Sequence, residues 1–235
     1  MEDGLLRENI AGVLKRISNA AERAGRSPDT IRLIAVTKTV NRHVIKRAIA
    51  MGLKDFGENR VQEAQQKVMS DELRVRRDII TWHFIGHLQK NKARIAVNLF
   101  DMIQTVDSFE LAELINKHAE DTGKTQHALI QVKLSKESAK TGILKENIRD
   151  IMVKLGSLRN VIIDGLMTMP PFFDDPEETR GYFNELRLLQ KELESDGFSL
   201  PELSMGMTND FEVAIQEGAT MIRVGTALFG EREKR

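Results

Sequence analysis

Strand-like and helix-like segments alternate along almost the whole chain, and this alternation limits the fold more than any other feature. The strand-like segments are short apolar runs, and in order they read IRLIAVT, DFG, TWHFIG, DMIQTV, HALIQVKL, VIIDGLMTM, ELSMG and MIRVG. Repeated strand–helix units produce parallel strands with right-handed crossovers. Eight such units in 235 residues predict an α/β fold, a (β/α)8 barrel of the TIM type, with an open doubly wound sheet as the alternative.

The barrel is expected to carry an additional helix at its N-terminal side. Between Leu6 and Ala24 apolar residues recur at helical spacing, and Gly25 can end the helix before the first strand. No linker, low-complexity tract or change of composition divides the rest of the chain. Residues 1–235 are therefore predicted to form a single domain.

The composition argues against several classes of protein. Lys and Arg together number 35, as do Asp and Glu, so the formal net charge is zero and nucleic acid is not an expected partner. No apolar stretch approaches the roughly 20 residues that span a bilayer. The absence of cysteine removes disulfides and thiolate nucleophiles and agrees with a cytoplasmic location. His83 and His87 are four residues apart, but the residues between them read as strand and turn, so no metal site is predicted.

Polar residues stand where the predicted strands end. In barrels of this type, functional groups lie on the loops after the C-terminal ends of the strands. The residues in such places are Lys38, Asn59, His83 and His87, Met169, the segment from Ser204 to Thr208 and the segment from Arg223 to Thr226. We therefore expect them to face one mouth of the barrel.

Two glycine-containing loops and one lysine suggest the chemistry of that mouth. SMGMT, with Gly206, and RVGTALFG, with Gly225 and Thr226, offer backbone N–H groups and hydroxyls, and phosphate sites after the last two strands recur in barrels. Lys38 ends an apolar strand, and a desolvated lysine can form an imine with an aldehyde. A candidate phosphate site together with this lysine suggests an aldehyde cofactor that carries phosphate. Two alternatives stay open. The lysine can simply extend to solvent, or the barrel can bind another phosphorylated metabolite without a covalent bond.

Several longer motifs resemble the pyridoxal phosphate homeostasis protein family over nearly the whole chain. They are AVTKT, FGENRVQE, WHFIGHLQKNK, GLMTMPP and LSMGMTNDFEVAIQEGATMIRVGTALFG. The resemblance implies a barrel related to the N-terminal domain of alanine racemase, with pyridoxal 5′-phosphate bound to Lys38 as an internal aldimine. It also implies a set of contacts: Ser204, Gly225 and Thr226 to the phosphate, Arg223 to the pyridine nitrogen, and Asn59, His83 and Gly206 as further pocket residues.

The resemblance further implies storage, buffering or delivery of the cofactor, with little or no turnover. Candidate recipients are apo forms of pyridoxal-phosphate-dependent enzymes, and we expect a monomer. An amino-acid racemase or a related enzyme is the alternative, but racemisation needs two proton-transferring groups, and Tyr182, the single tyrosine, is predicted to pack on a helix. Lys133 stands where the family pattern suggests an asparagine, and Lys140 matches a second family lysine.

Overall fold

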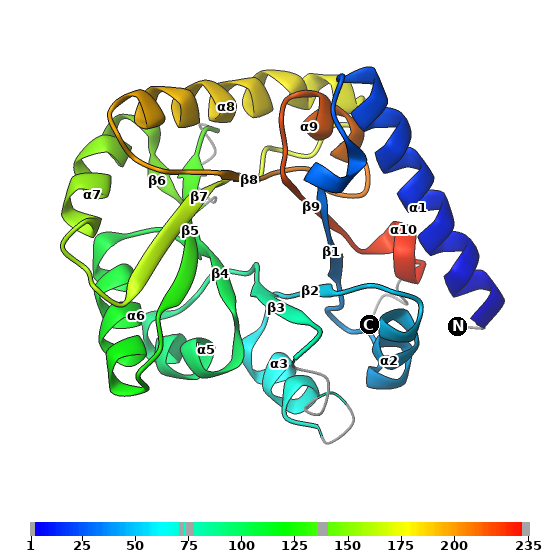
Figure 1. Ribbon diagram of the computed structural model, residues 1–235, viewed down its shortest axis with the longest axis horizontal. Coiled ribbons are helices and arrows are strands. Elements are labelled where there is room, and N and C mark those ends of the chain that lie inside the picture. The colour runs from blue at the N-terminus through cyan, green and yellow to red at the C-terminus, as the bar shows by residue number, and fades with distance from the viewer. Residues whose placement is uncertain (1–2, 71–72, 74–77, 136–140, 232–235) are drawn as a thin grey trace.

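Eight parallel strands form a closed barrel in the computed structural model, which describes residues 3–70, 73, 78–135 and 141–231. The barrel strands are β1 (Arg32–Val36), β2 (Asp55–Glu58), β3 (Thr81–Phe84), β4 (Met102–Val106), β5 (Gln126–Lys133), β7 (Val161–Met167), β8 (Glu202–Ser204) and β9 (Met221–Val224). Pairing of β1 with β9 and of β4 with β5 closes the ring, and helices surround it (Figure 1). The predicted barrel is confirmed, and the open sheet is excluded.

One short strand was not predicted. Residues Ile143–Leu144 form β6, which pairs in parallel with the end of β5 through Val132 and Lys133. Gly142 makes this possible, because its φ is 135° and a Cβ there would lie 2.9 Å from the backbone nitrogen of Lys133. The sequence indicated only a loop here, since a strand of two residues has no periodicity to detect.

The helices follow the predicted order. They are α1 (Asp3–Arg23), α2 (Arg42–Ala50), α3 (Val61–Val68), α5 (Ala93–Leu99), α6 (Phe109–Asp121), α7 (Ile148–Leu155), α8 (Arg180–Ser195), α9 (Phe211–Gln216) and α10 (Thr226–Phe229), with 3-10 turns η1 (Pro28–Thr30), η2 (Lys90–Lys92), η3 (Lys145–Asn147) and η4 (Pro176–Thr179). The sequence pattern predicts a helix from about Arg60 to Asp78, and this prediction was too long: α3 ends at Val68, where a turn follows.

Side chains cap the starts of several elements that follow barrel strands. Asn41 accepts a hydrogen bond from the N–H of His43 at 2.9 Å, and Ser108 accepts one from Leu111 at 3.2 Å. Asp175 does the same for η4. Such caps satisfy N–H groups that have no acceptor within the helix. These caps set the local direction of the chain where it enters α2, α6 and η4.

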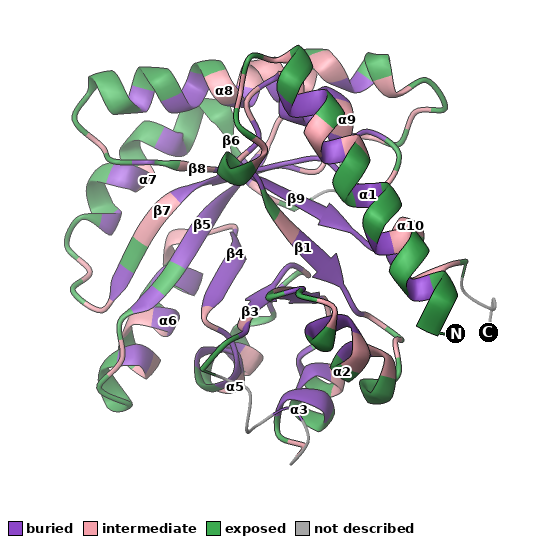
Figure 2. Ribbon diagram, turned by 45° about the vertical axis from the view of Figure 1, so that its right-hand side comes forward, coloured by how far each residue is buried: buried purple, intermediate pink, exposed green. Residues whose placement is uncertain are grey.

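The additional N-terminal helix, α1, is confirmed and covers α9 and α10 (Figures 1 and 2). One face of α1 is buried, and Figure 2 shows its opposite face exposed. Arg16 on α1 forms an ion pair of 2.6 Å with Glu212 and stacks over the ring of Phe211. Among the described residues, no helix is both long and apolar enough to cross a membrane.

The barrel encloses a small apolar cluster of its own. Ile34, Met102, Leu129, Met167 and Met221 pack there, apart from the larger core between strands and helices. Figure 2 shows that most of the barrel strands are buried. Polar side chains share the interior with this cluster, and they connect it to the site described next.

Candidate functional site

A cavity of about 480 Å³ opens at the C-terminal mouth of the barrel. Loops after β1, β2, β3, β7, β8 and β9 contribute its walls. Five of the predicted site residues line it, namely Lys38, Asn59, Arg223, Gly225 and Thr226. Its apolar lining includes Ile85, Met169, Phe172 and Phe173. The mouth thus combines an amine and a guanidinium with apolar walls.

Lys38 lies in a tight turn directly after β1, and this turn is held by a buried lysine. Lys67 on α3 donates to the carbonyl of Thr37 at 2.6 Å and to the carboxylates of Glu58 and Glu63 at 2.7 Å each. Glu63 also accepts the N–H of Thr39, whose φ of 64° is in the left-handed region. A β-branched residue rarely adopts that conformation, so the surrounding contacts must maintain it. The residues on both sides of Lys38 are therefore fixed.

The two carboxylates that contact Lys67 differ in their protonation behaviour. Burial raises the pKa of Glu58, and the nearby charge and hydrogen bond of Lys67 offset this only in part. Burial also acts on Glu63, but hydrogen bonds from Lys67 and Thr39 and the charge of Lys67 outweigh it, so the pKa of Glu63 is lowered. The cluster around Lys67 therefore contains one carboxylate that is costly to ionise and one that is easily ionised.

Arg223 is the second buried cation at the mouth, and it contacts neutral acceptors. Its Nη1 donates to the hydroxyl of Ser204 at 2.6 Å, and its Nη2 donates to the carbonyl of Thr168 at 2.9 Å. Burial lowers the pKa of Arg223 to about 10, although the charge of Asp210 opposes the shift. The guanidinium thus remains charged at neutral pH.

Three predicted site residues, Ser204, His83 and Gly206, are absent from the described lining of the cavity. Ser204 is fully buried between Arg223 and Gln104, and His83 is fully buried inside the barrel. Gly206 has φ 89°, and a Cβ there would lie 2.6 Å from the Cβ of Ala214, so its role in the turn is steric. Direct contacts from these three residues to a ligand stay predictions. Their positions indicate that they support the residues that line the mouth.

The position of Asn59 depends on a glycine in the neighbouring loop. A Cβ on Gly86 would lie 2.2 Å from the carbonyl oxygen of Asn59, so only glycine allows these two loops to approach. Thr105 holds the loop from the other side by donating to the carbonyl of Gly86 at 2.5 Å. Asn59 and Gly86 both line the cavity as a result.

The sequence reasoning expected Thr208 and His87 at the mouth, but it did not name Phe172 and Phe173. Thr208 lies in the same SMGMT loop as Ser204 and lines the cavity. Phe172 and Phe173 follow GLMTMPP, and the side chain of Phe172 is strongly exposed. His87 lines the mouth and lies 3.2 Å from Asp107, so His83 and His87 do not converge. For the two phenylalanines, GLMTMPP was the one available signal, because they directly follow this motif in the loop after β7.

A second cavity of about 450 Å³ adjoins the first. Both are lined by Met169, Phe172 and Met207, and the second extends to Lys133 and Gln131 on β5. Lys133 therefore lines the second cavity and is absent from the described lining of the first. Lys140 lies outside the described residues.

Comparison with known proteins assigns the family. The family model for the alanine racemase N-terminal domain matches residues 11–233. The pyridoxal phosphate homeostasis protein of Aquifex aeolicus is 43% identical over 228 residues, which cover 96% of this chain and 98% of that protein. This chain belongs to the pyridoxal phosphate homeostasis protein family. The Escherichia coli K12 member of that family is 36% identical over 228 residues, covering 96% of each protein.

Solved structures agree with this family assignment. PipY of Synechococcus elongatus, a structure described as having pyridoxal phosphate bound, superposes with a TM-score of 0.82 at 38% identity, covering 96% of this chain and all of that one. Alanine racemase of Clostridium difficile superposes with a TM-score of 0.72 at 19% identity. The match covers 97% of this chain and 56% of the racemase chain, and it shows a shared fold.

Proposed function

We propose that this chain binds pyridoxal 5′-phosphate at the C-terminal mouth of the barrel and stores, buffers or delivers it with little or no turnover. The observation that carries the proposal is the presence of Lys38, Arg223 and the Gly225-Thr226 turn around one apolar-walled cavity. The names of the pyridoxal phosphate homeostasis relatives and the pyridoxal phosphate bound to PipY support it. Both apply to proteins that this chain resembles over 96% of its length.

The residues present fit the chemistry of this cofactor. A cavity of about 480 Å³ has the size of a small-molecule site. The hydroxyls of Thr226 and Thr208, with nearby backbone N–H groups, suit a phosphate dianion. Phe172 and Phe173 can cover the faces of a flat ring. In this proposal Arg223 faces the pyridine nitrogen, Asn59 contacts the ring from the second loop, and the cofactor's aldehyde lies toward Lys38.

Lys38 is the residue we assign to the covalent bond. Its neutral amine attacks the aldehyde carbon, a C=N bond replaces the C=O bond, and one water molecule leaves, without a change in oxidation state. The turn fixed by Lys67 presents this amine to the cavity from the end of β1. Delivery to a recipient apo enzyme is the reverse step, in which water returns and the aldehyde is released.

Borohydride reduction followed by mass spectrometry of peptides tests this assignment. The wild-type protein loaded with pyridoxal phosphate should carry the reduced adduct on Lys38, and Lys38→Ala should carry none. Lys133→Ala is the matched control, because Lys133 borders the adjoining cavity, and it should keep the adduct. A stable adduct on another lysine in Lys38→Ala would contradict the assignment.

The phosphate contacts are tested separately. Thr226→Ala, Thr208→Ala and Ser204→Ala should each weaken binding by roughly 1–3 kcal/mol if the hydroxyl contacts the dianion, the usual effect of deleting a bond to a charged group. Because Ser204 is absent from the described lining, an effect of Ser204→Ala would have to act through Arg223. Equal affinity for pyridoxal and its phosphate would exclude the phosphate site.

The same geometry supports the proposal of low turnover. A charged guanidinium beside the pyridine nitrogen disfavours protonation of that nitrogen and weakens the cofactor as an electron sink. Tyr182 stacks against Phe173 with ring centroids 6.1 Å apart and is absent from the described lining. We therefore expect no inversion of single enantiomers of alanine and other amino acids incubated with the loaded protein in deuterated water, followed by chiral chromatography.

An amino-acid racemase remains the second candidate, and one observation favours it. His87 lines the cavity and is more than half exposed, so a base other than tyrosine is available at the mouth. Inversion over many turnovers that is lost in both Lys38→Ala and His87→Ala would establish this function in place of the first.

A further inference from the structure

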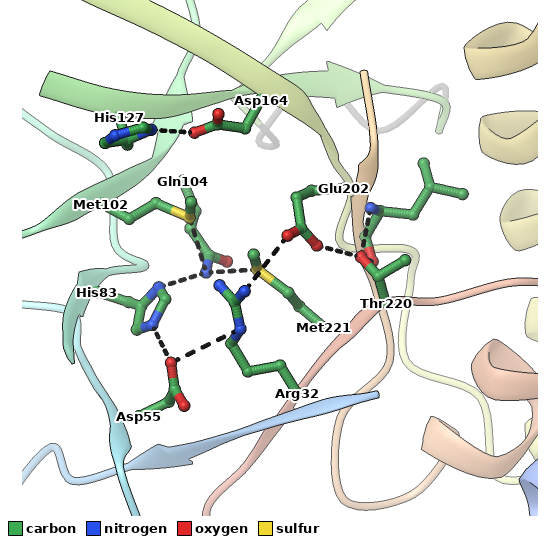
Figure 3. Close-up of polar contacts among 11 residues, drawn as sticks. Arg32, Asp55, His83, Met102, Gln104, His127, Asp164, Glu202, Thr220 and Met221 are labelled. Atoms are coloured by element: carbon green, nitrogen blue, oxygen red, sulfur yellow. Dashed lines mark hydrogen bonds and ion pairs between the residues drawn. The ribbon is translucent and has the colours of Figure 1, made fainter. Parts of the chain in front are cut away.

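Five side chains form a hydrogen-bonded chain that crosses the barrel interior from the cavity to the opposite end. In order they are Arg223, Ser204, Gln104, His83 and Asp55, from β9, β8, β4, β3 and β2. The successive distances are 2.6, 2.7, 3.1 and 2.9 Å. Figure 3 shows the half that contains Gln104, His83 and Asp55. We call this set the barrel chain.

The first two links have a fixed direction. A guanidinium has donors and no acceptor, so Arg223 donates to the oxygen of Ser204. The hydroxyl of Ser204 has a single hydrogen, and it donates that hydrogen to Oε1 of Gln104. If this hydrogen turned toward Arg223 instead, two donors would face each other in a buried place. Gln104 therefore decides whether Ser204 can accept from Arg223.

The amide of Gln104 is itself held in one orientation. Its Nε2 lies 3.1 Å from Nδ1 of His83 and 3.5 Å from the sulfur of Met221 (Figure 3). A thioether sulfur can accept a hydrogen bond but cannot donate one. The NH₂ group of Gln104 therefore belongs on this side, and its carbonyl oxygen faces Ser204.

Asp55 accepts the last hydrogen bond of the barrel chain, at the end away from the cavity. Nδ1 of His83 accepts from Gln104, so the ring proton is on Nε2, which donates to Oδ1 of Asp55 at 2.9 Å. Asp55 also lies 3.8 Å from Arg32. All four links thus donate in one direction, with a cation at the cavity and a carboxylate at the other end, and bonds aligned in this way strengthen one another.

We propose that Gln104 and His83 are positioning residues for Arg223, acting through Ser204 to hold the guanidinium in one orientation at the cavity wall. The part that concerns the cofactor rests on the proposed function. Gln104 suits this place because it uses separate atoms to accept and to donate, which neither a methionine nor a carboxylate does. The barrel chain also gives Ser204 and His83 a role at a site whose described lining they do not join.

The first experiment needs no cofactor. In the apo protein, ¹⁵N NMR of the arginine side chains should show slow rotation of the Arg223 guanidinium, with its signals assigned by their loss in Arg223→Lys. Gln104→Met has a similar volume but cannot bond to Ser204, and we expect rotation at least tenfold faster. Gln126→Met is the matched control, because Gln126 is also fully buried but donates to the carbonyls of Asp101 and His127, outside the barrel chain.

A second variant keeps the test decisive if Gln104→Met does not fold. Ser204→Ala removes one buried hydroxyl and should also speed the rotation of Arg223, although the bond to the carbonyl of Thr168 stays. Rotation in Gln104→Met or Ser204→Ala that matches wild type, or fast rotation in wild type itself, would overturn the proposal.

The second experiment uses the loaded protein. Gln104→Met should raise the dissociation constant of pyridoxal phosphate at least tenfold and shift the visible absorption band, whereas Gln126→Met should do neither. If wild type binds no cofactor, the proposed function fails while the NMR result still decides the role of the barrel chain. If wild type binds and the two glutamine variants behave alike, positioning by Gln104 is excluded.

Discussion

Lys67 and Arg223 are both buried cations near the same mouth, but their surroundings differ. Lys67 contacts two carboxylates and a backbone carbonyl within 2.7 Å. Arg223 donates to a hydroxyl and a carbonyl, and the carboxylate of the barrel chain, that of Asp55, is four links away. Two direct carboxylate contacts compensate the charge of Lys67. The charge of Asp210 also acts on Arg223, but the described hydrogen bonds of Arg223 go to neutral acceptors, so its charge is available to an anionic or electron-rich ligand.

This difference indicates that Lys67 stabilises the structure around the site and that Arg223 is placed to contact a ligand. Lys67 joins the loop after β1 to β2 and α3, so its charge sets the path of the backbone beside Lys38. Arg223 lines the cavity itself. A buried cation with two carboxylate partners is therefore expected to affect stability most, and a buried cation with neutral partners to affect ligand binding most.

Replacing Lys67 should produce the largest loss of stability. Lys67→Met leaves the buried carboxylate of Glu58 without its cation, and removing one partner of a buried pair typically costs about 3–5 kcal/mol. The free energy of unfolding from urea denaturation at pH 7 measures it. Lys46→Met, at an exposed position on α2, is the control and should change stability by less than about 0.5 kcal/mol.

Replacing Arg223 should cost less stability in the apo protein. Arg223→Met removes the donor to the carbonyl of Thr168, at a cost of about 1–3 kcal/mol, while the hydroxyl of Ser204 keeps its bond to Gln104. The same urea denaturation checks this value. If Arg223→Met proved more destabilising than Lys67→Met, the contrast between a structural and a ligand-facing cation would fail.

Glu58 should make the protein less stable as pH rises. Its pKa is raised in the folded state, so its contribution is fully present below its ordinary value of 4.5 and is lost as pH rises through the folded pKa. One proton limits the slope to about 1.4 kcal/mol per pH unit. Comparison of Glu58→Gln with wild type by urea denaturation from pH 4.5 upward should show this loss in wild type alone. Parallel curves would show that Lys67 compensates Glu58 fully.

The smallest effect is expected at Thr39. Its left-handed φ of 64° costs about 1–2 kcal/mol, and glycine removes that strain but adds about 0.5–1 kcal/mol of unfolded-state entropy. Thr39→Gly should therefore stabilise the apo protein by about 0.5–1 kcal/mol in thermal and urea unfolding. Ala50→Gly, at an exposed helical position, should destabilise it by a similar amount. If Thr39→Gly were less stable than wild type, contacts of the Thr39 side chain would contribute more to stability than its backbone strain costs.

The sequence by itself determined the barrel and much of its mouth. Alternating segments dictate parallel strands, and closure of a parallel barrel brings all the strand ends to one rim, which is why Lys38, Asn59 and Arg223 could be placed together. The cap at Asn41 could be read locally, because a side chain that accepts from a residue two positions on needs no tertiary contact.

Tertiary structure alone decided which side chains reach the cavity and which support it. The link from Ser204 to Gln104 spans 100 residues, and that from Lys67 to Thr37 spans 30. Nothing in the local sequence distinguishes Ser204, which bonds to Arg223, from Thr208, which lines the cavity. The physical reason is that periodicity and caps act between near neighbours, whereas a buried hydrogen bond depends on distances between strands that only closure of the barrel sets.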